Sequence, residues 1–66
     1  HFTINATPIV IGEKCWLATD VFVAPGVTIG DGTVVGARSS VFKSLPVNVV
    51  CRGNPAVVIR ERVQAE

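Results

Sequence analysis

A strict period of six residues runs through most of this 66-residue chain. Every sixth position from Ile11 to Val41 carries an aliphatic side chain, without exception. Because an amphipathic strand repeats every two residues and a helix every 3.6, this period fits neither element alone and is typical of a solenoid. Each hexad would supply one short strand and one corner of a triangular parallel β-helix, with the aliphatic residue inside. The six aliphatic positions are Ile11, Leu17, Val23, Ile29, Val35 and Val41.

The other positions of the hexad are also patterned. The residue after each aliphatic one is small in five of six hexads, which predicts that the backbone turns there. The position four residues after each aliphatic one is small or medium throughout, and we expect it to point inward as well. Three hexads close one coil, so residues 11–28 and 29–46 are predicted to form two coils, stacked at about the 4.8 Å strand spacing. The second inward positions are Cys15, Val21, Val27, Thr33, Ser39 and Leu45.

A β-meander is the alternative interpretation of the same residues. Its hairpin turns would lie at Pro25-Gly26 and Asp31-Gly32, and Asp-Gly is a strong hairpin signal. Six unbroken matches to the hexad favour the solenoid. The composition agrees with an all-β fold of either kind, because 23 of the 66 residues are Val, Ile or Thr.

The two ends of the chain depart from the repeat. Residues 1–10 are predicted to be an extended lead-in, residues 11–46 the β-helix, and residues 47–66 an exit segment with a capping helix. Asn54 and Pro55 suit the N-cap and first position of a helix over residues 55–64, in which Ala56, Ile59 and Val63 have helical spacing. Such a helix would cover the exposed end of the last coil. Two coils are fewer than a solenoid normally needs, so we expect further coils to precede this chain.

Composition and charge exclude several classes of protein. A chain of 7.0 kDa allows one small domain, and a formal net charge of +1 is too balanced for one that binds nucleic acid. No uncharged stretch reaches the roughly 18 residues of a transmembrane helix, and we expect no secretory signal within these 66 residues. Two distant cysteines, Cys15 and Cys51, favour free thiols in a reducing compartment. These features predict a cytoplasmic protein.

The hexads and three short motifs together resemble the C-terminal end of the hexapeptide-repeat acyltransferases. The motifs are Pro25-Gly26-Val27-Thr28-Ile29-Gly30, Gly36-Ala37-Arg38-Ser39-Ser40-Val41 and Gly53-Asn54-Pro55-Ala56. Within that family, Thr7 to Gly12 followed by Cys15-Trp16-Leu17-Ala18, together with Ala37-Arg38-Ser39, is most similar to the branch that acts in biosynthesis of the exopolysaccharide colanic acid. The resemblance covers nearly the whole chain.

The resemblance implies an architecture and an activity. It implies a left-handed parallel β-helix, a hand that the repeat itself cannot predict because parallel crossovers are usually right-handed. It implies a homotrimer with acetyl-CoA in the cleft between neighbouring subunits. It also implies transfer of the acetyl group to a hydroxyl of a sugar or lipid-linked oligosaccharide, without a metal ion.

Acetyl transfer from a thioester requires a base for the attacking hydroxyl and a donor for the oxyanion. The only histidine here, His1, precedes Pro8 by seven residues, whereas the catalytic histidine of the family precedes the matching proline by roughly a dozen. His1 therefore does not match that histidine. We expect the base to lie upstream and no catalytic residue to lie in this chain.

This chain does contain residues that match cofactor-binding positions of the family. Lys43 and Arg60 match basic residues of the family near the adenosine phosphates of CoA, although solvated surface charge would also explain them. Trp16 matches an aromatic residue that borders the acceptor in some relatives, and a subunit interface would explain it equally well. Four small residues would leave room for the pantetheine arm of the cofactor to lie against the backbone. The alternative is that they are small only because the corners of a solenoid require small residues. These residues are Ala18, Ala24, Gly36 and Ala37.

Two positions depart from the family pattern. Phe42 stands where relatives often have Thr, and Val57 stands where some have a basic residue. A phosphate or adenine contact is therefore expected to be lost at these positions, or replaced by stacking on the Phe42 ring.

Two other functions remain open at this point. A non-catalytic solenoid that serves as a trimerisation or binding module would need no cofactor. Zinc carbonic anhydrases share the fold but need three histidine ligands, and a single unmatched His1 argues against them.

Overall fold

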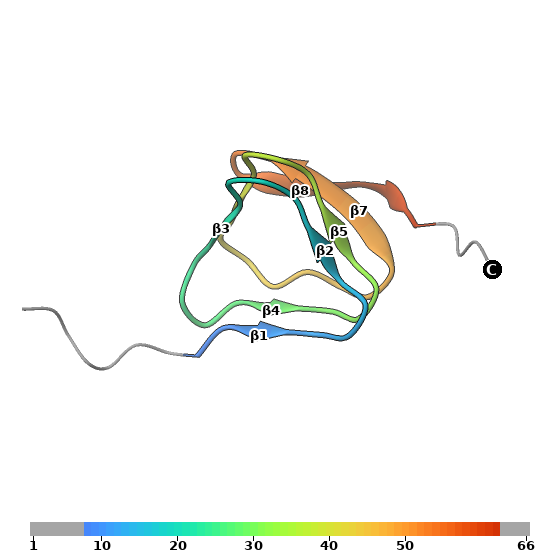
Figure 1. Cartoon of the computed structure of the whole chain (residues 1–66), viewed down its shortest axis with the longest axis horizontal. Coiled ribbons are helices and arrows are strands. Elements are labelled where there is room, and N and C mark those ends of the chain that lie inside the picture. Colours follow the sequence, from blue (N-terminus) through green and yellow to red (C-terminus); the bar gives the residue numbers. More distant parts are fainter. Residues whose placement is uncertain (1–7, 63–66) are drawn as a thin grey trace, which may run out of the picture.

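The computed structural model describes residues 8–62, which wind into a triangular coil with one short strand on each side (Figure 1). The strands β1 and β4 form one face, β2, β5, β7 and β8 form a second, and β3 and β6 form the third. Their bounds are β1 Val10–Ile11, β2 Trp16–Leu17, β3 Phe22–Val23, β4 Thr28–Ile29, β5 Val34–Val35, β6 Ser40–Val41, β7 Val49–Gly53 and β8 Ala56–Glu61.

Stacking of the coils follows the register that the hexads predict. The first two coils pair in parallel with an offset of 18 residues on every face, for example Ile11 with Ile29 and Leu17 with Val35. Three hexads therefore close one coil, as predicted, and the β-meander is excluded because its strands would pair antiparallel. The next coil is shorter, since Val35 pairs with Cys51 at an offset of 16.

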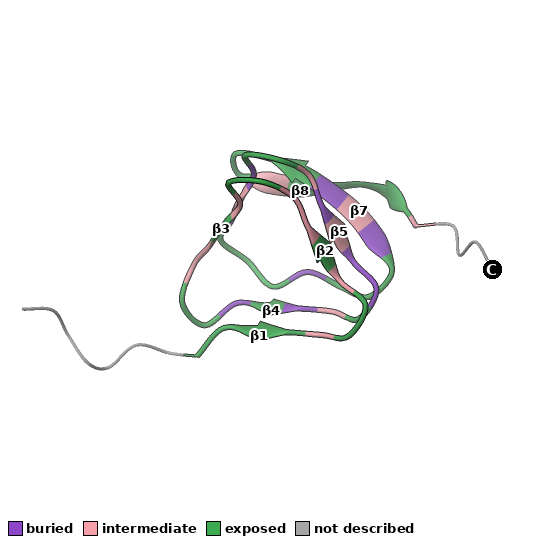
Figure 2. Cartoon of the chain, viewed as in Figure 1, coloured by how far each residue is buried: buried purple, intermediate pink, exposed green. Residues whose placement is uncertain are grey.

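The core is a column built largely from the repeated aliphatic side chains. Figure 2 colours the buried residues purple, and they include residues of β4, β5 and β7. Ile29, Val35 and Val41 of the second coil are fully buried, because a coil or part of one stacks on each side of them. Ile11 keeps 47% of its surface exposed, because only one side of the first coil is covered within residues 8–62. The second inward position of the hexad is also confirmed, and its two polar side chains, Thr33 and Ser39, are buried. Both have hydrogen-bond partners: Thr33 donates from Oγ1 to the Pro46 carbonyl, and Ser39 Oγ accepts from the Gly53 amide at 3.0 Å.

The small residue after each aliphatic one does not lie at the turn, contrary to the prediction. Backbone with positive φ recurs every six residues, but two positions later in each hexad. The small residues are needed instead because the next coil passes close to them. A Cβ on Gly30 would lie 2.6 Å from the Pro46 carbonyl carbon and from the Val47 nitrogen. The residues with positive φ in the five successive turns are Lys14, Asp20, Gly26, Gly32 and Arg38.

The prediction of a helix over residues 55–64 is wrong. The chain reverses at Gly53, whose φ is +108°, and β8 returns antiparallel along β7, from Gly53 paired with Ala56 to Val49 paired with Glu61. The β-branched run Val57-Val58-Ile59 favours a strand, and pairing with β7 satisfies an edge that a helix would leave open. Val63, the last residue of the proposed helical spacing, lies outside the described residues.

Candidate functional site

Three of the small residues predicted to contact the cofactor lie at one edge of the triangle. Ala18 follows β2, and Gly36 and Ala37 follow β5 one coil later. The Ala18 amide donates to the Val35 carbonyl at 3.0 Å, and the Gly36 amide donates to the Cys51 carbonyl at 2.9 Å. A Cβ on Gly36 would lie 3.1 Å from the Arg52 Cβ, so the stacking of the coils by itself requires a small residue there. Ala37 is exposed. We call residues 18, 36 and 37 the first edge.

Ala24 and Lys43 lie at a different edge. Ala24 follows β3, and Phe42 and Lys43 follow β6. The Ala24 amide donates to the Val41 carbonyl at 2.9 Å, which places Ala24 opposite Phe42 in the next coil. Lys43 is exposed, and Phe42 keeps 54% of its surface exposed. We call residues 24, 42 and 43 the second edge.

Arg60 belongs to neither edge. It lies on β8, paired with Val50, and its Nη1 donates to the Glu61 carbonyl at 3.3 Å. Its side chain is exposed on the outermost strand of the four-stranded sheet. One copy of the chain thus distributes the six predicted cofactor residues over two edges and a strand, and does not gather them in one pocket.

Trp16 lies on β2 and points outward, with 66% of its surface exposed. Its register partner in the next coil is Val34, on the same face. The outward position agrees with the hexad pattern. That Trp16 borders the acceptor stays a prediction.

Neither cysteine has the environment of a nucleophile. Cys15 is half-buried, and its Sγ donates to the Gly30 carbonyl at 3.1 Å. Cys51 is buried on β7, and burial raises the pKa of its thiol above 9.0. A raised pKa lowers the fraction of reactive thiolate at neutral pH.

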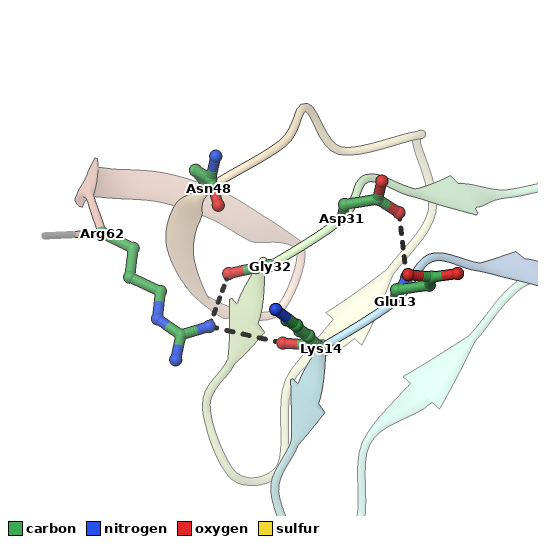
Figure 3. Close-up of a pocket in the computed structure, with 6 residues that line it drawn as sticks. All are labelled: Glu13, Lys14, Asp31, Gly32, Asn48 and Arg62. Carbon is green, nitrogen blue, oxygen red and sulfur yellow. Dashed lines mark hydrogen bonds between the residues drawn. The ribbon is translucent and has the colours of Figure 1, made fainter. Parts of the chain in front are cut away.

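The third edge holds a cavity that sequence analysis missed (Figure 3). Arg62 reaches across it, donating from Nη1 to the Gly32 carbonyl at 2.8 Å and to the Lys14 carbonyl at 3.3 Å. The Arg62 amide donates to the Asn48 carbonyl at 2.8 Å, and Asp31 Oδ1 accepts from the Glu13 amide at 2.8 Å. The cavity encloses about 290 Å³ and is lined by Glu13, Lys14, Asp31, Gly32, Asn48 and Arg62.

Arg62 therefore contacts the turns of three successive coils. Its guanidinium engages main-chain carbonyls, which indicates a structural role for this side chain. The six-residue period does predict that Lys14 and Gly32 lie at stacked turns, because they are 18 residues apart. Arg62 could not be assigned to the same site, because residues 55–64 were expected to form a helix and not the strand β8 that leads Arg62 to these turns.

Two other features are absent from the part of the chain that the structure describes. Residues 8–62 contain no group of three or more His, Cys, Asp or Glu side chains that could hold a metal ion. No helix in the same range is long and apolar enough to cross a membrane. His1 lies outside this range.

Comparison with known sequences places this architecture in a family. Residues 8–43 match the family described as bacterial transferase hexapeptide (six repeats). All 66 residues align at 96% identity with a protein of Escherichia coli (strain K12) named as a colanic acid biosynthesis acetyltransferase, WcaF, and cover 36% of it. The galactoside O-acetyltransferase of the same organism is 54% identical over 54 residues, which are 82% of this chain and 27% of that protein. The chain thus spans about a third of the length of these relatives.

Solved structures agree with the sequence comparison. A hexapeptide-repeat acetyltransferase of Vibrio cholerae, complexed with acetyl coenzyme A, superposes with a TM-score of 0.84 at 36% identity, covering 88% of this chain and 32% of that one. A galactoside acetyltransferase in complex with coenzyme A gives a TM-score of 0.82 at 53% identity, covering 83% of this chain and 28% of that one. The fold is the left-handed parallel β-helix that the resemblance implied, with β8 in place of the predicted helix within residues 8–62. The chain belongs to the bacterial transferase hexapeptide family.

Proposed function

We propose that this chain is the C-terminal, cofactor-binding part of an acetyl-CoA-dependent O-acetyltransferase. The acceptor is a sugar hydroxyl in the biosynthesis of the exopolysaccharide colanic acid, and the enzyme works in the cytoplasm. The observation that carries this proposal is the 96% identity with the acetyltransferase WcaF over all 66 residues. The structural similarity to acetyltransferases bound to acetyl coenzyme A or coenzyme A supports the choice of donor.

A homotrimer explains why one copy does not gather the candidate residues. In a triangular solenoid two edges are separated by a full face, so Ala18 and Lys43 of the same copy cannot line a single narrow cleft. A cleft between neighbouring subunits would be lined by the first edge of one copy and by the second edge or β8 of the next. The exposed apolar side chains, including Trp16, Phe22 and Val57, supply surface for such contacts.

Each group in this chain has a definite part in the proposed reaction. The small residues of the first edge let the pantetheine arm approach the backbone, and the charges of Lys43 and Arg60 face the phosphates. The sugar hydroxyl attacks the thioester carbonyl and its proton passes to a histidine upstream. The tetrahedral intermediate then collapses, the carbon–sulfur bond breaks, and CoA leaves as the thiol after receiving that proton.

Calorimetric titration of CoA into the full-length enzyme tests the assignment of the phosphate contacts. Lys43→Gln and Arg60→Gln each remove a charge-assisted hydrogen bond, so each should weaken CoA binding roughly tenfold or more. Lys14→Gln is the matched control, because it removes the same charge at the third edge, and it should change the affinity less than about twofold. Pantetheine has no phosphate and should bind all of these proteins alike.

The outcomes separate the competing functions. Equal weakening by all three substitutions would indicate a general effect of charge and would contradict the assignment of Lys43 and Arg60. A folded wild-type protein that does not bind CoA would favour the solenoid as a non-catalytic trimerisation or binding module.

A further inference from the structure

The cavity at the third edge lies where the turns of three successive coils stack (Figure 3). Lys14, Gly32 and Asn48 have positive φ, at 60°, 74° and 55°, so a left-handed residue recurs at this edge in every coil. Main-chain hydrogen bonds fix these turns to one another. The Gly32 amide donates to the Glu13 carbonyl at 2.8 Å, and the Asn48 amide donates to the Asp31 carbonyl at 2.9 Å. The backbone therefore preforms the third-edge cavity.

The side chains around the cavity carry charges of both signs. Lys14 and Arg62 are positive, Glu13 and Asp31 are negative, and the four formal charges sum to zero. Figure 3 shows both positive groups to the left of both carboxylates. The Arg62 guanidinium already donates to main-chain carbonyls. The side chains of Glu13 and Lys14 have no hydrogen bond or ion pair within residues 8–62, so a carboxylate and an ammonium group are available to a ligand.

This set of groups excludes several ligands and favours one class. Phosphate would be repelled by the two carboxylates, and a metal ion would find only two carboxylates beside two cations. A zwitterion matches the charges, but four of the six lining residues are exposed to solvent, where ion pairs contribute little. A hydroxyl group both donates to carboxylates and accepts from ammonium groups. A volume of about 290 Å³ is just below that of pockets for drug-sized ligands, which suits one sugar ring.

The cavity is one face of the coil away from the first edge. Glu13 and Lys14 precede β2, and Ala18 of the first edge follows it. Four residues of extended chain, from residue 14 to residue 18, span about 13 Å. The face between the two edges carries the exposed Trp16 and, within β2 and β5, no charged side chain. A sugar in the cavity would therefore lie too far from the first edge to be the sugar that reacts there.

We propose that the third-edge cavity is a subsite for one neutral sugar ring of the acceptor, other than the ring that is acetylated. This inference rests on the proposed function and adds to it a second contact with the acceptor chain. Hydroxyl groups of the ring donate to the carboxylates of Glu13 and Asp31 and accept from the Lys14 ammonium group. No bond of the sugar is made or broken in the cavity, so these residues position the acceptor.

Calorimetric titration of the full-length protein with oligosaccharides from deacetylated, partially hydrolysed colanic acid tests the proposal. Glu13→Gln and Asp31→Asn each replace a carboxylate acceptor, and each should weaken oligosaccharide binding about fivefold. Asp31→Asn keeps an oxygen that can accept from the Glu13 amide, so the turn is preserved. Glu61→Gln is the matched control, because it changes an exposed carboxylate on β8 outside the cavity, and its effect should be under about twofold. The affinity for CoA should be the same in all of these proteins.

The outcomes distinguish this inference from the proposed function. If the wild type binds CoA and the oligosaccharides, and both cavity variants bind the oligosaccharides as well as it does, the subsite is overturned and the proposed function stands. An equal loss from Glu61→Gln, or a parallel loss of CoA affinity, also overturns the subsite, because the effect is then general. Binding of glycine that Asp31→Asn abolishes assigns the cavity to a zwitterion and overturns the sugar subsite. A wild-type protein that binds neither CoA nor the oligosaccharides overturns both.

Discussion

Arg62, directly after β8, donates a hydrogen bond from its guanidinium to the carbonyl oxygen of Gly32, thirty residues earlier, at 2.8 Å. The same nitrogen contacts the Lys14 carbonyl in the first coil, and the Arg62 amide contacts Asn48 in the third. One residue thereby joins the stacked turns of three coils.

Arg62→Ala should lower the free energy of unfolding by about 1–2 kcal/mol, because it removes a charged donor from two carbonyls in a half-buried site. Urea denaturation followed by circular dichroism measures the change. Arg60→Ala is the matched control two residues earlier, since the Arg60 guanidinium donates to the carbonyl of the adjacent Glu61, and its effect should be under about 0.5 kcal/mol. Equal effects of the two substitutions would contradict the joining role of Arg62.

Gly30→Ala should be strongly destabilising, by about 2 kcal/mol or more, because the added Cβ would meet the backbone of Pro46 and Val47 at 2.6 Å. Gly36→Ala should be milder, since the nearest neighbour of its added Cβ is the Arg52 Cβ at 3.1 Å, a contact that a smaller shift relieves than the 2.6 Å contacts at residue 30. Denaturant midpoints of the two variants provide the comparison. If Gly36→Ala were the more damaging, close approach of the coils would not be the reason for these glycines.

Ile29→Ala should cost about 2–5 kcal/mol because the side chain is fully buried between coils. The same change at Ile11 should cost much less in the 66-residue chain, where Ile11 is 47% exposed. In the full-length protein, the cost at Ile11 should rise toward that at Ile29 if further coils stack on the first one. Unfolding experiments on both proteins measure this difference, and an unchanged small cost at Ile11 would argue against such coils.

Burial of Cys51 predicts a specific dependence of stability on pH. Burial raises the pKa of the folded thiol above 9.0, so the unfolded chain loses this proton first as the pH rises. The contribution of Cys51 is therefore complete below about pH 9 and is lost as the pH increases from there toward the folded pKa. Cys51→Val should unfold with a shallower decline of stability above pH 9 than the wild type. Parallel curves for the two proteins would show that this thiol does not contribute to the decline.

The six-residue period by itself determined the coil, its two inward positions and the offset of 18 residues between paired strands. These features are local and repeated, so each hexad carries the same information and six of them agree. Ala18 and Gly36 occupy the same hexad position one coil apart, and the hydrogen bond from the Ala18 amide to the Val35 carbonyl places them opposite each other at one edge. Their part in binding the cofactor stays a proposal, because it depends on a second copy and on a ligand.

Only the tertiary structure decided the last coil and the end of the chain. From Leu45 onward the offset between paired residues is 16 in place of 18: Leu45 pairs with Ile29, and Cys51 pairs with Val35. The segment after Pro55 has both helical spacing and a β-branched run, and its local preferences therefore do not select one structure. The open edge of β7 selects the strand, since its backbone groups need partners. That strand brings Arg62 to Gly32, a contact between residues too far apart in sequence for any local pattern to predict.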